Sequence, residues 1–151
     1  MSNKKTRKAS TQNVKSPVKP VQSRGFFRTY PRWLFKQFDF THPTWGLDFN
    51  KEHLTDIFRY LSNLEGQTWG EILTTKSGRN SNTRNHPVEF SDMTKEAQSR
   101  AKYINIDEYD GLYSIAVDNK KRVWGHINDG LFYIVWIDGE HAICPASKKN
   151  T

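Results

Sequence analysis

One arginine and two histidines near the C-terminus have side chains suited to handling a phosphate group. Arg122 and His126 lie in one run of apolar and aromatic residues, and His141 lies beyond the next run. The planar guanidinium of arginine matches the oxygens of a phosphate, and imidazole transfers protons near neutral pH. If these residues lie on one small sheet, they form a candidate phosphate-handling site.

The elements that must position these side chains are short strands. Runs of β-branched and aromatic residues at 112–117, 122–127 and 131–137 are separated by turn sequences around residues 118–120 and 128–130. The third run is nearly all apolar, which favours a central strand covered on both faces. Asp138-Gly139 is typical of a hairpin, so residues 141–144 are expected to form a fourth strand. The pattern predicts a C-terminal antiparallel meander.

Helices are predicted upstream of this meander. An apolar stripe over residues 54–64, with Asn50 as its N-cap, indicates an amphipathic helix that ends near Gly66. Thr68 and Glu71 have capping-box spacing and begin a short second helix. A third helix begins at Ser91 or Thr94. We therefore predict an α+β fold, with the helices packed on one face of the antiparallel meander.

The charge of the chain is concentrated at its beginning. Of 23 Lys and Arg residues, seven lie in residues 1–25, which contain no acid, and the other 16 balance the 16 Asp and Glu residues. Residues 1–25 are also polar and lack aromatic residues, so we expect a disordered basic tail followed by one domain at 26–151. The tail is expected to attract RNA or DNA, with Lys4, Lys5, Arg7 and Lys8 among its contacts; a merely solubilising tail is the alternative.

Two further segments have compositions compatible with nucleic-acid binding. Residues 26–50 combine many aromatic rings with basic residues, which either stack on single-stranded nucleic acid or cover the core. Phe38 and Phe40 alternate with polar residues, as in a short strand. Residues 74–87 form a polar stretch with Lys76, Arg79 and Arg84, interpreted either as a loop embracing a nucleic-acid backbone or as an ordinary exposed loop.

The sequence TKEAQSRAKYINIDEYDGLYSIAVDNKKRVWGHINDGLFYIVWIDGEHAICP resembles the RelE/ParE toxin superfamily. Arg122-Val123 stands where that family has a central Arg-Val pair, and His141 where several ribonuclease members have a terminal histidine. The resemblance covers about residues 50–147 and implies a RelE-like fold. It also implies an endoribonuclease, acting on free RNA or at the ribosome, that an antitoxin protein neutralises; some members are gyrase poisons. The chain differs in its extra N-terminal segments and in having Ala142, not tyrosine, after His141.

The resemblance implies RNA cleavage without a metal. A base takes the proton of the 2′-hydroxyl, the oxygen attacks the adjacent phosphate, and an acid protonates the leaving 5′-oxygen. Arg122 would hold the phosphate, His141 would be base or acid, and His126 or His86 would take the second role. The alternatives are structural histidines and an ion pair of Arg122 with an acid such as Asp138. Lys148 and Lys149 either reach the phosphate or form an exposed end.

Other function classes lack support in the sequence. Glycine-rich nucleotide-binding motifs and a nucleophile elbow are missing, Cys144 is the only cysteine, and no apolar run could span a membrane. We expect a cytoplasmic protein without a metal or other cofactor. Two alternatives to an enzyme remain: a non-catalytic protein that binds RNA or a ribosome through its tail and sheet, and an interaction protein whose meander docks a partner chain.

Overall fold

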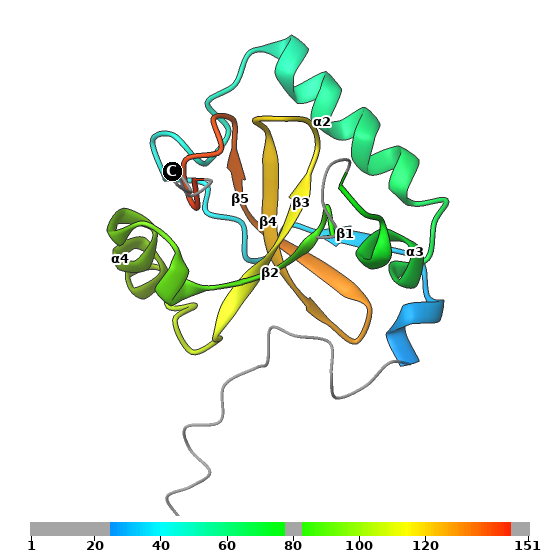
Figure 1. Cartoon of the computed structure of the whole chain (residues 1–151). Helices are drawn as coiled ribbons and strands as arrows, with labels where there is room; N and C mark the ends of the chain where they lie inside the picture. Colours follow the sequence, from blue (N-terminus) through cyan, green and yellow to red (C-terminus); the bar gives the residue numbers. More distant parts are fainter. Residues whose placement is uncertain (1–24, 78–82, 146–151) are drawn as a thin grey trace, which may run out of the picture.

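The computed structural model describes residues 25–77 and 83–145, which form an α+β fold around one mixed sheet (Figure 1). Five strands have the spatial order β1-β5-β4-β3-β2. The elements, in chain order, are η1 (Gly25–Arg28), β1 (Arg32–Leu34), α2 (Lys51–Leu64), α3 (Trp69–Thr74), β2 (His86–Glu89), η2 (Phe90–Asp92), α4 (Lys95–Tyr103), β3 (Gly111–Ala116), β4 (Arg122–Asn128) and β5 (Leu131–Asp138).

The three long C-terminal strands form the predicted antiparallel meander. β4 pairs with β3 on one side and with β5 on the other, both antiparallel. Two short strands that were not predicted extend it. β2 pairs antiparallel with β3, and β1 pairs parallel with β5, so the complete sheet is mixed. Both are only three or four residues long, and their partners lie far away in the sequence.

The helix boundaries follow from local capping interactions. Asn50 accepts a hydrogen bond from the backbone N–H of His53 and begins α2. Thr68 and Glu71 form the complete capping box of α3. Of the two proposed starts of the third helix, Thr94 is the one observed, since its side chain accepts from the N–H of Ala97. Each cap satisfies a backbone donor that has no partner within its helix.

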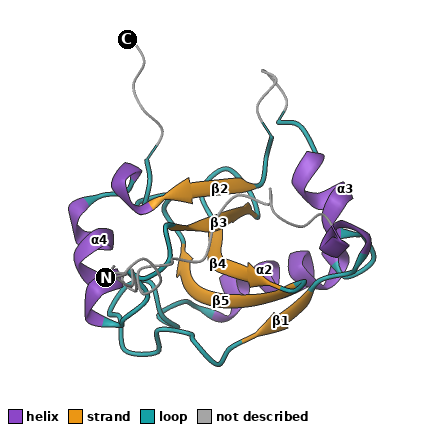
Figure 2. Cartoon of the chain, turned by 90° about the horizontal axis from the view of Figure 1, so that it is seen from below, coloured by secondary structure: helices purple, strands orange, loops and turns teal. Residues whose placement is uncertain are grey.

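The helices cover both faces of the sheet, not one face as the sequence predicted. Ile57 of α2 and Ile72 of α3 belong to the same apolar cluster as Ile115. Ala97 of α4 belongs to a second cluster with Trp124. Because alternate strand residues point to opposite faces, a sheet with apolar residues on both needs a cover on both. Figure 2 shows α4 and α3 at opposite sides of the strands.

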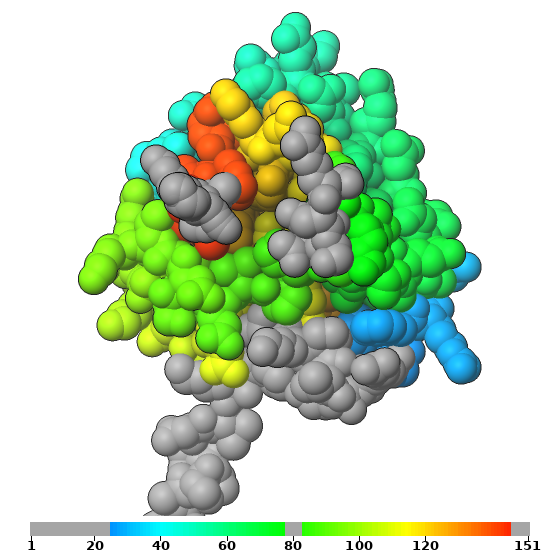
Figure 3. Space-filling model, viewed as in Figure 1, coloured from blue at the N-terminus to red at the C-terminus, as the bar shows by residue number. Residues whose placement is uncertain are grey.

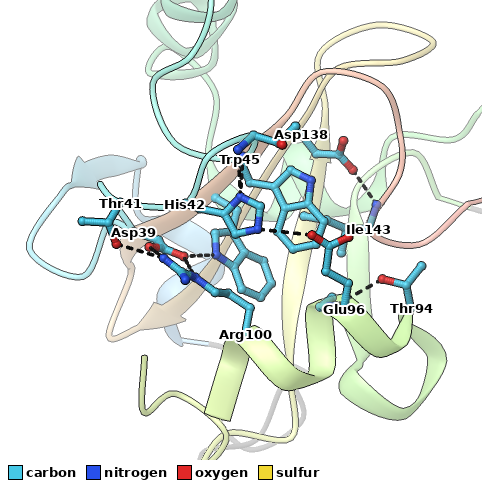
Figure 4. A network of polar contacts seen from close by, with 12 residues as sticks. Asp39, Thr41, His42, Trp45, Thr94, Glu96, Arg100, Asp138 and Ile143 are labelled. Carbon is cyan, nitrogen blue, oxygen red and sulfur yellow. Dashed lines mark hydrogen bonds and ion pairs between the residues drawn. The ribbon is translucent and has the colours of Figure 1, made fainter. Parts of the chain in front are cut away.

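The aromatic N-terminal segment is mainly a cover for the core. Phe38 and Trp45 are buried, whereas Phe40 is 61% exposed. The predicted strand at Phe38 and Phe40 is wrong, because the chain there forms turns instead of pairing with the sheet. Asp39 explains the turn: its carboxylate is buried and accepts hydrogen bonds from Arg100 of α4 and from the indole of Trp136 (Figure 4).

The predicted fourth strand at 141–144 is also absent from the described residues. The chain turns after β5, and His141 has a φ of +56°, in the left-handed region that strand pairing excludes. The segment then runs back toward α4, where the carbonyl of Ile143 accepts a hydrogen bond from the N–H of Thr94 at 3.0 Å. His141 is therefore presented by a turn that crosses the α4 face of the sheet.

The apolar stripe expected over residues 54–64 includes Phe58, which is expected to be buried. In the structure Phe58 is 49% exposed, although Ile57 and Leu61 on the same helix are buried. The apolar stripe of α2 is wider than the surface it covers, and Phe58 lies beyond its edge.

Candidate phosphate-binding and acid–base site

Arg122 begins β4 at the end of the sheet that carries the β3–β4 turn, and that turn holds its guanidinium. Nη1 donates to the carbonyl oxygens of Asp118 at 2.6 Å and of Lys121 at 3.1 Å. The Asp118 carboxylate accepts from the backbone N–H groups of Lys120 and Lys121 and from the Lys121 ammonium. Partial burial raises the pKa of the Asp118 carboxyl, but these hydrogen bonds outweigh it and lower that pKa to about 2. The turn is thereby rigid, and Arg122 is oriented before any ligand binds.

A cleft of about 590 Å³ lies beside this turn. Its walls include the basic side chains of Lys76, Arg84 and Arg122 and the imidazole of His86. The volume falls in the range of small-molecule sites, and the walls are unusually rich in cations for a surface of nearly balanced charge. The cleft is thus suited to an anion with the dimensions of one or two nucleotide units.

Arg84 is fixed within the cleft wall. Its Nε and Nη2 donate to the carbonyl of Ala116 at 3.1 and 2.9 Å, and Nη2 also donates to that of Val117. The guanidinium stacks over the ring of Tyr60 in α2, 5.7 Å from the ring centroid. Its charge acts on Arg122, and together with burial it lowers the pKa of that guanidinium. The carboxylates of Asp118 and Asp138 act on the same guanidinium in the opposite direction, and Asp118 also lines the cleft.

His86 lies on β2, on the same face of the sheet as Arg122. The strand register places His86 opposite Ser114, and Ala116, two residues further on β3, opposite Arg122. Residues two apart on a strand share a face, so both side chains project to the α4 side. Two strand spacings and two residues along the strand separate their backbones, roughly 12 Å in all.

His141 approaches the same region from the C-terminal turn. Burial lowers its pKa, the positive charges of Arg122 and His86 lower it further, and Asp138 opposes them. These influences require Arg122 and His86 to lie near His141. On the surface, the C-terminal turn lies next to the β3–β4 turn (Figure 3). Of the four proposed catalytic residues, Arg122 and His86 line the cleft, and His141 lies near enough for both to act on its pKa.

His126 does not lie with the other three. It is 8% exposed and stacks between Tyr109 and Tyr133, with ring centroids 4.2 and 4.9 Å away. Its Nε2 contacts the side-chain oxygen of Gln37. Burial lowers the pKa of His126 to about 4, so the ring is neutral at pH 7. It shares a face with Arg122 but lies four residues along β4, roughly 13 Å away. His126 is thus packed among aromatic rings and does not belong to the cleft lining.

Only some of the proposed nucleic-acid contact residues lie within the described part of the chain. Lys76 and Arg84 lie in the cleft wall. The remaining ones lie outside the described residues: Lys4, Lys5, Arg7, Lys8, Arg79, Lys148 and Lys149. The predicted polar stretch 74–87 contains a bridge between Lys76 and Thr83 and the beginning of β2.

The roles of two residues are not evident from the sequence. Asp138 is expected there only as an ion-pair partner of Arg122 and as a hairpin residue, but it is buried and organises the turn that carries His141. The strongly polar Asp-Gly-Glu-His sequence after an apolar strand was the available signal. Asp118 is expected from the sequence as a turn residue, but its role in orienting Arg122 through its carbonyl is not.

Within residues 25–77 and 83–145, no cluster of three or more His, Cys, Asp or Glu side chains could hold a metal ion. A search of the same residues for a helix of the length and hydropathy needed to cross a bilayer finds none. In chemical terms, the cleft combines fixed cations suited to a phosphate with the imidazole of His86, while His141 lies outside its lining. Comparisons of the chain with protein-family models, with curated proteins and with solved structures find no match.

Proposed function

We propose that the protein is a metal-independent endoribonuclease of the RelE-like kind. The observation that carries the proposal is a basic cleft lined by Arg122 of β4 and His86 of β2, with His141 of the C-terminal turn near enough for both to act on its pKa. Histidines flanking a fixed arginine are the groups that phosphodiester transfer to a 2′-oxygen requires.

The proposed reaction assigns one task to each group. His141, whose lowered pKa keeps it neutral at pH 7, takes the proton of the ribose 2′-hydroxyl. The 2′-oxygen forms a bond to the adjacent phosphorus, and the bond from phosphorus to the 5′-oxygen breaks. His86 delivers a proton to that leaving oxygen. Arg122 stabilises the negative charge on the phosphorane, and the products are a 2′,3′-cyclic phosphate and a 5′-hydroxyl.

The RelE-like assignment draws support from the order of elements at the C-terminus. α4 is followed by three antiparallel strands, and Arg122-Val123 begins the central one. By the same resemblance, an antitoxin protein would neutralise the enzyme, and the ribosome is a candidate site of action. The parallel edge strand β1 and the helix cover on both faces are additions to the expected pattern.

The decisive experiment measures RNA cleavage by the purified full chain in EDTA, with and without ribosomes, and identifies the new ends. Arg122→Ala, His141→Ala and His86→Ala are each expected to lower the rate by about 10²- to 10⁴-fold. His126→Phe is the matched control, because it removes an imidazole outside the cleft and should leave the rate unchanged.

Each contrary result has a defined meaning. RNA that stays intact under both conditions, together with binding that Arg122→Ala weakens, would replace the enzyme by a non-catalytic RNA- or ribosome-binding protein. Cleavage that survives the three substitutions in the cleft would place the reaction elsewhere. Products ending in a 5′-phosphate would exclude attack by the 2′-hydroxyl.

A further inference from the structure

The turn after β5 is organised by one buried carboxylate. Asp138 is 1% exposed, and its two oxygens accept from different backbone groups. Oδ1 accepts from the N–H of Glu140 at 3.1 Å, and Oδ2 accepts from the N–H of Ile143 at 2.7 Å. The second of these bonds is drawn in Figure 4. These two donors flank His141 in the sequence, so Asp138 determines the course of the chain on both sides of that histidine.

The conformation of His141 needs such support. Its φ of +56° is unfavourable for a residue with a side chain, at a cost of about 1 to 2 kcal/mol. The far end of the turn is also fixed, because Ile143 is fully buried and its carbonyl accepts from Thr94 at the start of α4. A turn held at both ends presents His141 in one position, half-buried, above the end of the sheet.

The same carboxylate is the direct register partner of Arg122. Three nearby groups act electrostatically on His141: Asp138 on β5, Arg122 on β4 and His86 on β2. The turn also carries Glu140, which forms an exposed ion pair with Lys120 of the β3–β4 turn at 3.5 Å. Of the three groups that act on His141, Asp138 alone is negative.

We propose that Asp138 is a positioning residue, which holds His141 beside Arg122 and balances the positive charge around it. The proposal rests on the proposed function above, in which His141 is the base. Asp138 itself touches no substrate in this scheme. It acts through the backbone geometry and the charge that His141 experiences.

Asp138→Asn tests both aspects with little change of shape. It removes the charge and places an amide N–H₂ against one backbone N–H, so we expect kcat to fall by about 10²-fold with KM nearly unchanged. Because Asp138 raises the pKa of His141, its loss should move the acidic limb of the kcat/KM profile to lower pH. Asp138→Glu restores the charge and should return that limb toward its original position.

Glu140→Gln is the matched control. It removes a carboxylate two residues away, on the exposed side of the same turn, and should change neither kcat nor the pH profile. If Asp138→Asn lowers activity only as far as it lowers the folded fraction, and the pH profile stays in place, Asp138 is merely structural and the proposal fails.

Two measurements separate this proposal from the proposed function. The His141 ring can be titrated by NMR in the unmodified chain and in Asp138→Asn, and a lower pKa in the variant is expected even if the protein cleaves no RNA. If Asp138→Asn does not fold, the proposal can still be tested by amide hydrogen exchange of the unmodified chain. Strong protection of the Ile143 N–H supports the proposal, and fast exchange overturns it.

Discussion

Arg122 and Asp138 are paired directly across β4 and β5, yet each is held by the backbone of a neighbouring turn. The guanidinium donates to the carbonyls of Asp118 and Lys121, while the carboxylate accepts from the N–H groups of Glu140 and Ile143. Among the ion pairs of the described residues, none involves Arg122. Carbonyls thus orient the guanidinium, while the carboxylates of Asp118 and Asp138 act on it without forming a close ion pair.

The pH dependence of stability should identify His126 as a buried neutral histidine. Its pKa of about 4 lies below the unfolded value of about 6.5. The unfolded chain therefore binds a proton that the folded chain does not, and stability is lost as the pH falls from about 6.5 to about 4. The loss is on the order of 3 kcal/mol. Urea unfolding at several pH values should show this slope in the wild type and a flatter one in His126→Phe. An identical slope in both proteins would contradict the assignment.

Replacing Arg100 should destabilise the fold, because the buried carboxylate of Asp39 would lose its cationic partner. Arg100 donates two hydrogen bonds to it, at 2.8 and 2.7 Å, and these, together with the Trp136 indole, outweigh burial and lower the pKa of Asp39. We expect Arg100→Gln to lower the free energy of unfolding by about 3 to 5 kcal/mol. Lys120→Gln, which breaks only the exposed pair with Glu140, should change it by less than about 1 kcal/mol. Similar losses of unfolding free energy in both variants would show that the buried ion pair contributes no more to stability than the exposed one.

Gly125 should tolerate no side chain. It lies at the register shift between β4 and β5, and a Cβ there would collide with the carbonyl of Tyr133 and with the ring of Phe132. We expect Gly125→Ala to destabilise the protein by about 3 kcal/mol in chemical denaturation. Gly66→Ala is the control, because its new methyl group would meet nothing closer than 3.6 Å. A change within about 1 kcal/mol is expected there, and an equal loss at both positions would refute the steric explanation.

Deleting residues 1–24 should weaken RNA binding and reduce its dependence on salt. Those residues carry seven Lys and Arg and no acid. If all seven contact phosphates of a single strand, the slope of log K against log salt becomes shallower by roughly 5 units. Filter binding of one labelled RNA at several salt concentrations measures this slope. An unchanged slope after deletion would remove the tail from the binding surface.

The sequence predicts those parts of the fold that depend on local signals. The capping residues Asn50, Thr68 and Thr94 lie beside the helices they begin, and β3, β4 and β5 are long, apolar and separated by strong turns. Strands β1 and β2 depend instead on partners far away in the chain. Strand periodicity alone cannot assign such short segments.

In the candidate site, too, local sequence signals predict some features, while others depend on contacts between distant parts of the chain. Two-residue periodicity places Arg122 and His126 on one face of a strand, which the structure bears out, but it does not reveal how far apart they lie or what covers each. His126 is covered by Tyr109 and Gln37, from segments on either side of it in the fold. His86 reaches the cleft only because β2 adds to β3. Tertiary contacts, which no local pattern encodes, distinguish the packing histidine His126 from the cleft histidine His86.

The parallel pairing of β1 with β5 has a consequence for how the chain is made. Arg32 pairs with Leu131, so β1, the first strand to be synthesised, cannot pair until β5, the last strand, has been synthesised. At ordinary rates of synthesis, about 100 residues take roughly 5 to 20 s. Throughout that interval Trp33 and Trp45 lack the rings of Phe132 and Trp136, against which they pack in the finished protein. The most aromatic part of the chain is thus the part exposed longest to chaperones, and truncated products that end before β5 should be the first to aggregate.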